Sequence, residues 1–359
     1  MSDNGTRRMI ERYTDDAPAS LYLASKFRTP PENFHDSEFV EIDIERDSED
    51  VAVVVKDLSV EGRGNESSIY TNKEWTPPIY KEKATVNAFK LLKRMPGSTA
   101  YDSPVYKANA LNAVMGEVRK IEKKIQRAIE LQASQTLQTG TLTLKNSDGV
   151  NMYSLDFQPK SSHIVTVGND WGGGSETPLA DIEALSVVVK RDGKQRPNEL
   201  TFGRLAWQDF LADSDVQTRL NFRRADLAVV SPSRSERNAM FQGRITVGNY
   251  EFEMFTYDAT YDDVETGTST PYVTDDLVIM TSSESRFDLT YGGIPLIGDP
   301  DPMAMQFVPR RISNGGNGID LFVNAWTAKD RSSITVEVSA RPLTIPTAID
   351  TIGVLNTRA

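Results

Sequence analysis

Residues 103–140 read SPVYKANALNAVMGEVRKIEKKIQRAIELQASQTLQTG. Ser103 is a favourable N-cap, and Pro104 suits the first helical position, where its missing N–H has no intrahelical partner to lose. Gly140 suits the left-handed position that follows a helix. The stretch therefore predicts one helix of about 35 residues, or about 52 Å at a rise of 1.5 Å per residue. Since an ordinary helix has roughly 11 residues, this one must shape the architecture around it.

The predicted helix has one apolar face. Its seam, built from positions three and four apart, consists of Leu111, Val114, Val118, Ile121, Ile125, Ala128 and Gln132, and Gln132 interrupts it near the end. The opposite face is charged and consists of Arg119, Lys120, Glu122, Lys123, Lys124, Arg127 and Glu130. A coiled coil could use such a seam, but about three heptads is a marginal length for one. Packing against a β-sheet of the same domain explains the seam better.

The chain before the helix reads as a polar arm followed by a long β-ribbon. Residues 1–38 contain three prolines and no sustained periodicity, which is typical of an extended arm. Residues 39–44 alternate in period two, residues 51–55 are wholly apolar, and residues 61–68 form a polar tip. The chain returns through residues 75–78 and a strand-like stretch at 85–92. Because such ribbons are seldom stable alone in water, something outside the segment should cover this one.

The chain after the helix mixes both kinds of element. Asp148 and Gly149 favour a tight hairpin turn between strands at 141–144 and 153–157. A strand at 163–167, a helix at 178–190, a strand at 199–202 and a helix at 204–212 follow. The clearest later strands are at 226–230, 250–257, 276–280 and 333–338. With helices early and strands late, the predicted class is α+β.

Composition indicates a folded protein that is poor in catalytic side chains. Of the 359 residues, 38% are hydrophobic and 25% charged, and none is cysteine, so disulfides and thiolate chemistry are excluded. His35 and His163 are the two histidines, too few for most metal and triad chemistry. No run approaches the roughly 18 apolar residues of a membrane span, and the N-terminus lacks a signal-peptide core. A cytoplasmic location is therefore expected.

The net charge of −11 is unevenly distributed. Residues 1–50 carry 13 acidic and six basic side chains, a balance of −7, whereas residues 81–130 carry five acidic and eleven basic ones, a balance of +6. One interpretation is two solvated faces that happen to differ. The other is an acidic arm that lies against a basic helix, in the same chain or in a neighbour. An acidic protein is also a poor general binder of nucleic-acid phosphate, although it could lie beside packed DNA.

No catalytic constellation emerges from the sequence. Carboxylate pairs occur as Asp262-Asp263, Asp275-Asp276 and Asp299/Asp301, without the spacing of a calcium-binding hand, and solvated loop charge explains them better. The glycines at 172–174 and 315–316 lack the neighbours of a phosphate-binding or dinucleotide-binding loop. The four tryptophans are too scattered for a nucleic-acid stacking platform. We therefore expect no catalytic, cofactor-binding or metal-binding residues.

The order of these elements resembles the Hong Kong 97 capsid fold, and more specifically the lambda-type major capsid protein E family of tailed bacteriophages. Residues 73–81 (KEWTPPIYK) look like the family's return strand from its extended loop. Residues 108–144 resemble its spine helix and the strand that follows. Residues 169–171 and 178–183 resemble its tryptophan-containing loop and first axial-domain helix, and residues 339–343 (SARPL) its closing strand. Each motif is short, so their order and spacing along nearly the whole chain carry the resemblance.

The resemblance implies a division of the chain into an N-terminal arm (1–40), an extended loop (41–83), a peripheral domain with the spine helix (84–160 and 310–345), an axial domain (161–309) and a C-terminal tail (346–359). It implies a major capsid protein whose copies form hexamers and pentamers that close into an icosahedral shell around phage DNA. The candidate inter-subunit contacts lie on the return strand, the basic helix face and the acidic strand: Trp75, Pro77, Pro78, Arg119, Lys120, Lys123, Lys124, Arg127, Glu41, Asp43 and Glu45.

The resemblance also implies partners: a separate scaffolding protein, a portal protein, a possible decoration protein at three-fold sites, and double-stranded DNA held without sequence-specific contact. No membrane is expected, and the location would be the virion capsid, assembled in the bacterial host cytoplasm. The chain would not be an enzyme. Two alternatives stay open: an encapsulin-like nanocompartment shell protein with the same fold, and, more distantly, a β-rich hydrolase that uses one of the aspartate pairs.

Overall fold

A computed structural model describes residues 21–35, 37–45, 70–87, 106–146, 148–174, 176–221, 228–234, 238–263, 265–294, 321–330 and 332–358. These ranges contain both helices and strands, and strands dominate after residue 221, which confirms the α+β class. The predicted strand at 51–55, the tip at 61–68 and the segments at 299–301 and 315–316 lie outside them. Within the described residues, no helix combines the length and the apolar character needed to cross a membrane.

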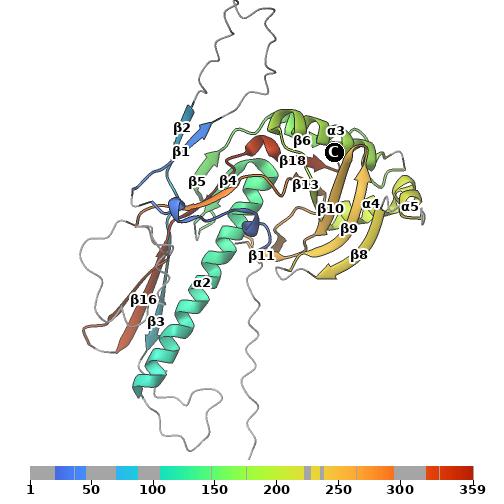
Figure 1. The fold of residues 1–359 in the computed structure, drawn as a ribbon. Coiled ribbons are helices and arrows are strands. Elements are labelled where there is room, and N and C mark those ends of the chain that lie inside the picture. Colours follow the sequence, from blue (N-terminus) through green and yellow to red (C-terminus); the bar gives the residue numbers. More distant parts are fainter. Residues whose placement is uncertain are drawn as a thin grey trace, which may run out of the picture.

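The long helix is confirmed as α2, Tyr106–Thr139, with 34 residues. It runs diagonally through the molecule in Figure 1. Gly140 ends it in the left-handed region at φ +63°, and its N–H donates to the Thr136 carbonyl oxygen at 3.1 Å. This is the geometry for which glycine is favoured, because a Cβ would be strained there. The predicted cap at residues 103 and 104 lies outside the described residues.

Helix α2 packs on a three-stranded antiparallel sheet of its own chain, as the seam predicts. The sheet order is β15 (Phe322–Thr327), β16 (Ser333–Ala340) and β3 (Tyr80–Asn87). Val118 and Ile125 of the helix share one buried cluster with Val336 and Val338 of β16. Strand β3 begins at Tyr80 rather than at residue 85, because its pairing with β16 starts at Tyr80 opposite Ala340. Residues 88–92 of the predicted strand lie outside the described residues.

A short hairpin follows the helix. Strands β4 (Thr141–Lys145) and β5 (Asn151–Asp156) pair antiparallel, and Gly149 sits between them at φ +76°. The Asn146 side-chain oxygen accepts from the N–H groups of Asp148 and Val150, both at 2.9 Å. Strands β14 (Asp288–Tyr291) and β17 (Pro342–Ile345) form a second two-stranded sheet, and helix α2 contacts both β4 and β17.

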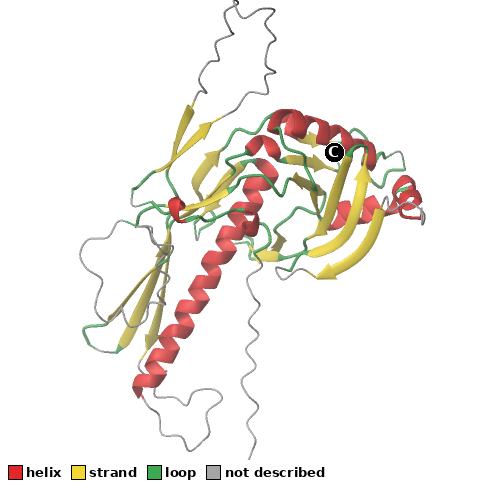
Figure 2. Ribbon diagram, in the orientation of Figure 1, coloured by secondary structure: helices red, strands yellow, loops and turns green. Residues whose placement is uncertain are grey.

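The second body is a seven-stranded mixed sheet. Its order is β6 (Ile164–Thr166), β18 (Gly353–Asn356), β13 (Leu277–Thr281), β7 (Glu199–Phe202), β10 (Tyr250–Thr256), β9 (Met240–Val247) and β8 (Ala228–Arg234). Helices α3 (Pro178–Gly193), α4 (Arg204–Ala212) and α5 (Ser214–Asn221) lie around it (Figure 2). Ile182, Leu185 and Val189 of α3 are buried in its core on one side of the helix, as their spacing predicts. A small hairpin, β11 (Thr260–Asp262) and β12 (Ser269–Pro271), follows β10.

Two segments depart from the predicted organisation. Residues 346–359 were expected as a tail, yet residues 353–356 form β18 inside the seven-stranded sheet, paired parallel to β6 and antiparallel to β13. Residues 1–38 were expected as an unpacked arm, yet Leu23 and Phe27 are buried in the main core. A strand of four residues and a short apolar turn are too brief to show a period, so pattern alone could not assign them.

Candidate assembly surfaces

A two-stranded ribbon projects from the body of the subunit (Figure 1). It consists of β1 (Val40–Glu45) and β2 (Tyr70–Trp75), paired antiparallel from Val40 opposite Trp75 to Glu45 opposite Tyr70. Val40 is buried, and the Trp75 ring meets the Phe157 ring edge-on with centroids 6.0 Å apart. The ribbon is therefore anchored at its base, by the residue pair nearest the body.

The three acidic candidates occupy alternate positions of β1. Glu41 is exposed and lies opposite Glu74, Asp43 lies opposite Asn72, and Glu45 lies opposite Tyr70. Two like charges directly opposite each other in a ribbon are destabilising. The pairing of Glu41 with Glu74 therefore destabilises the isolated ribbon. A cationic partner would remove that penalty.

The proline candidates lie at the root of the ribbon. Pro77 is buried within its own chain, next to Gly292, where an added Cβ would come within 2.8 Å of the Pro77 Cγ. Pro78 is half-buried, and the neighbouring Ile79 is 56% exposed. The structure therefore places Pro77 among contacts of this chain and leaves Ile79, which was not among the candidates, as the apolar side chain open to a neighbour.

The basic candidates lie on the outer side of α2. Arg119, Lys120, Lys124 and Arg127 are exposed, and Lys123 is half-buried. Lys120 donates to Glu117 at 2.9 Å, and Lys124 donates to Glu82 of β3 at 3.3 Å. Exposed ion pairs of this kind contribute roughly 0–1 kcal/mol. These lysines can therefore exchange their present partners for carboxylates of another subunit at little cost.

Glu130, which the spacing placed on the charged outer face, is fully buried instead. One carboxylate oxygen accepts from the Leu23 N–H at 2.8 Å and the Tyr257 hydroxyl at 2.7 Å, and the other accepts from the Ala24 N–H at 2.9 Å. Burial raises the pKa of Glu130, against the opposing effect of these hydrogen bonds. Glu130 is buried because residues 21–27 cover this part of the helix. A helical period in the sequence cannot show which distant segment covers a helix face.

Gln132 belongs to the buried seam rather than interrupting it. Its amide nitrogen donates to the Tyr80 hydroxyl at 2.7 Å and to the Pro342 carbonyl at 3.2 Å. Its amide oxygen accepts from the Thr344 N–H at 3.3 Å. A polar side chain with three partners can be buried without an unsatisfied group, so Gln132 joins the helix to β3 and β17.

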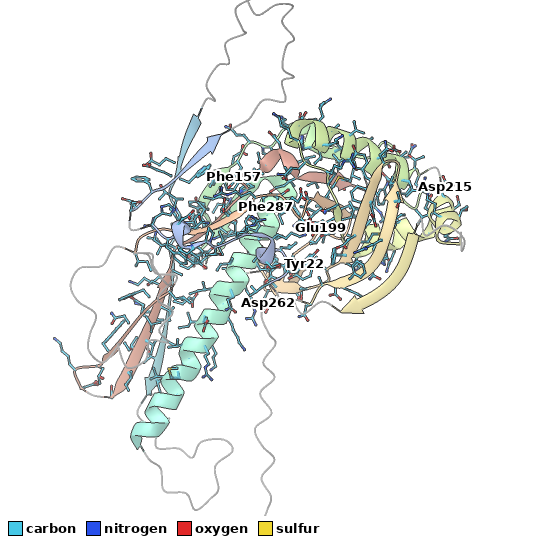
Figure 3. The ribbon with its side chains drawn as sticks, in the orientation of Figure 1. Tyr22, Phe157, Glu199, Asp215, Asp262 and Phe287 are labelled. Atoms are coloured by element: carbon cyan, nitrogen blue, oxygen red, sulfur yellow. The ribbon has the colours of Figure 1, made fainter. Side chains whose placement is uncertain are left out.

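Residues 21–27 join α2 to the seven-stranded sheet. The Tyr22 hydroxyl lies 3.1 Å from the Thr201 hydroxyl, and the Lys26 ammonium contacts the Glu199 carboxylate of β7. Figure 3 shows Tyr22 and Glu199 between the helix and the strands. With Glu130 on the opposite side, this segment holds the two bodies of the subunit against each other.

Arg341, in the motif at residues 339–343, is buried between β16 and β17 at 3% exposure and was not among the candidate residues. Its guanidinium donates to the main-chain carbonyls of Glu38, Pro77 and Gly293. The signal that could have found it is a single charged side chain in the buried run from Val338 to Ile345. Burial lowers the pKa of Arg341, with a smaller opposing effect from Glu38.

The residues considered for catalysis have structural surroundings. His163 is buried, with Nδ1 2.8 Å from the Ile352 carbonyl and Nε2 3.2 Å from Asp192. Asp275 pairs with Arg204 at 2.7 Å, and Asp276 with Arg358 at 3.6 Å. Across the part of the chain that the structure describes, no three His, Asp or Glu side chains are grouped so as to hold a metal ion.

A projecting ribbon, a long helix on an antiparallel sheet and a second body built on a mixed sheet define a capsid subunit of the Hong Kong 97-like class. The chain belongs to the phage major capsid protein E family, whose model matches residues 5–353. It is therefore a major capsid protein, a structural component of the phage head that assembles with copies of itself.

The chain is also similar to solved structures at low sequence identity. The chain is similar to a structure described as a prophage capsid protein of E. coli CFT073, with 17% identity, a TM-score of 0.58, and coverage of 81% of this chain and 80% of that one. It is also similar to a structure from Microbacterium phage Oxtober96, with 11% identity, a TM-score of 0.47 and coverage of 97% and 95%. A comparison with curated protein sequences finds no match.

Proposed function

We propose that this major capsid protein forms hexamers and pentamers that close into an icosahedral shell around double-stranded phage DNA. The observation that carries the proposal is the β1–β2 ribbon. Among the described strands, each of the two has a single hydrogen-bonded neighbour, so its other edge is unpaired. A two-stranded ribbon is marginal in water, and open strand edges favour pairing with another chain. A neighbouring subunit that covers the ribbon would satisfy both needs.

Charge supports a specific neighbour contact. The ribbon points away from α2 in Figure 1, so its acidic strand and the basic helix face lie apart within one subunit. A contact between them needs two copies of the chain. We infer that the acidic strand of one subunit faces the basic side of α2 in the next, through Glu41, Asp43 and Glu45 on one side and Arg119, Lys120, Lys123, Lys124 and Arg127 on the other.

The remaining partners follow from the proposed shell. They are a separate scaffolding protein, a portal protein, packaged DNA held without sequence-specific contact, and a decoration protein at three-fold sites over the arm and extended loop. Assembly would take place in the bacterial host cytoplasm. The chain would act without a cofactor and without catalysis, as a component of the virion capsid.

An encapsulin-like shell is the nearest rival, because the fold alone does not separate the two. The match of the phage major capsid protein E family to residues 5–353 favours the phage head over the nanocompartment. A hydrolase is the more distant rival. Its test is replacement of Asp262, Asp263, Asp275 and Asp276 by Asn together, which would abolish hydrolysis and leave a shell able to form.

Electron microscopy of the chain expressed with its neighbouring phage genes tests the proposal. The expected result is closed polyhedral particles that contain this chain as the main component. Soluble monomers under all conditions would contradict it. Particles that enclose an enzyme encoded next to this chain would favour an encapsulin-like shell. Terminase and portal genes next to this chain would favour the phage capsid.

A further inference from the structure

One side chain meets both roots of the projecting ribbon. The chain enters β1 through Glu38 and leaves β2 through Pro77, and the Nη2 atom of Arg341 donates to the carbonyl oxygens of both, at 3.2 Å and 3.1 Å. The same guanidinium donates through Nη1 to the Gly293 carbonyl at 2.5 Å. Gly293 follows β14, so the third hydrogen bond joins the two roots to the body.

Arg341 itself is firmly held. Its carbonyl oxygen accepts from the Gly292 N–H at 3.0 Å, and the next residue, Pro342, pairs with Tyr291 in the β14–β17 sheet. The guanidinium is planar and carries its five N–H donors in a rigid fork, so three acceptors in fixed positions determine its orientation. A rigid donor on a rigid sheet fixes the positions of the two roots relative to each other and to that sheet.

Other contacts hold the roots one at a time. The Tyr153 hydroxyl donates to the Thr76 carbonyl at 2.8 Å, and the Gly293 N–H donates to the Ser37 carbonyl at 2.9 Å. Trp75 packs on Phe157. These contacts keep each root near the body, whereas Arg341, among the described side chains, donates hydrogen bonds to both roots.

We propose that Arg341 is a positioning residue that sets the direction in which the β1–β2 ribbon leaves the subunit. Because a small rotation at the root is amplified along the ribbon, this direction determines which part of a neighbour the ribbon reaches. Its consequence for shell geometry rests on the proposed function, but the direction of the ribbon is a property of the single subunit.

Distance measurements between spin labels test the direction itself. The chain contains no cysteine, so the pair Asn72→Cys on β2 and Val187→Cys on α3 can be labelled alone. Val187 is 52% exposed and lies in the second body. In unassembled subunits, Arg341→Met should widen the distance distribution at least twofold. The matched control is Arg219→Met, which removes a guanidinium that also donates to a main-chain carbonyl, that of Thr246 at 2.8 Å, far from the ribbon.

The shell gives the second readout. Arg341→Met should reduce the yield of regular closed particles at least tenfold, with circular dichroism unchanged, and Arg219→Met should assemble like the wild type. If Arg341→Met does not fold, Arg341→Lys is measured in its place, because lysine keeps the charge but cannot form the forked set of hydrogen bonds. Arg341→Lys should also widen the distribution of distances between the spin labels. A wild-type distance distribution in a folded Arg341 variant overturns the proposal, and so does failure of both variants to fold. A widened distribution in a chain that never forms shells would contradict the proposed function and leave the positioning role intact.

Discussion

Glu130 shows how one carboxylate can organise distant parts of the chain. It accepts three hydrogen bonds, from two N–H groups of the segment at 21–27 and from Tyr257, which directly follows β10. Burial raises the pKa of the Tyr272 phenol, and the nearby Glu130 carboxylate adds to that rise.

We expect Glu130→Gln to lower the free energy of unfolding by about 1–3 kcal/mol, because the amide NH₂ would face an N–H donor that then loses its acceptor. Denaturant unfolding followed by fluorescence measures this loss. Glu251→Gln, at an exposed position of β10, is the control and should change the stability by less than about 0.5 kcal/mol.

The pH dependence of that difference has a defined sign. Burial raises the pKa of Glu130, so the stability it contributes is fully present below the ordinary value of about 4.3 and is lost as the pH rises through the raised pKa. The difference in the free energy of unfolding between the wild type and Glu130→Gln should therefore decrease as the pH rises. An increase of this free-energy difference with pH would contradict the raised pKa of Glu130 and its burial.

The sequence could place Glu130 on α2 but not inside the protein. Leu23, 107 residues away, belongs to a segment that has no period of its own, and Tyr257 lies 127 residues away on the other side in sequence. Arg341 is similar, since its acceptors are main-chain carbonyls 48 to 303 residues away and carry no residue-type signal. Local patterns specify faces of elements, whereas tertiary contacts specify which faces are covered.

At the scale of elements, the prediction was strongest where a period and an end signal coincide. Helix α2 ends at Thr139 before Gly140, and strand β7 and helix α4 have the predicted bounds. Strand β3 was placed five residues late, because its first residues, Tyr80 to Ala84, carry three charged side chains and lie at the edge of the sheet.

Replacement by alanine should have opposite effects on stability at two glycines, Gly116 inside α2 and Gly140 directly after it. At Gly140, φ is +63° and an added Cβ would lie 2.5 Å from the Pro159 Cγ, so Gly140→Ala should destabilise by at least about 1–2 kcal/mol. At Gly116, inside the helix, an added Cβ meets nothing within 4 Å, so Gly116→Ala should stabilise by about 0.5–1 kcal/mol. Thermal unfolding by circular dichroism compares the two; equal effects would contradict the assigned helix end.

At the scale of the whole molecule, the distribution of charge distinguishes an assembling subunit from a protein with two unrelated surfaces. The ribbon and the outer face of α2 have opposite charge and lie apart in one copy. The order of elements along the chain could be predicted, and with it the fold family. The contacts between the two bodies could not, because they depend on the buried segment at 21–27.

Reversal of Lys120, Lys123 and Lys124 to Glu tests the charge contact. It should reduce assembly and make the remaining shells more sensitive to salt, because screening weakens contacts between exposed charges. Light scattering across a salt series measures both effects. The control reverses three exposed cations of the other body, Lys190, Lys194 and Arg196, and has the same net charge. Unchanged assembly and salt tolerance in the variant would contradict the contact between the acidic strand and α2. An equal loss of assembly in the control would contradict it as well.

The position of β18 has a consequence for how the chain is made. Strand β18 lies between β6 and β13, although it is synthesised after both. While the ribosome is still translating the chain before residue 353, those two strands have no neighbour between them, and the seven-stranded sheet stays divided. A fragment released early by premature termination therefore exposes two strand edges and lacks a complete second body. Completion of the seven-stranded sheet therefore depends on residues 353–356, the last strand to be synthesised.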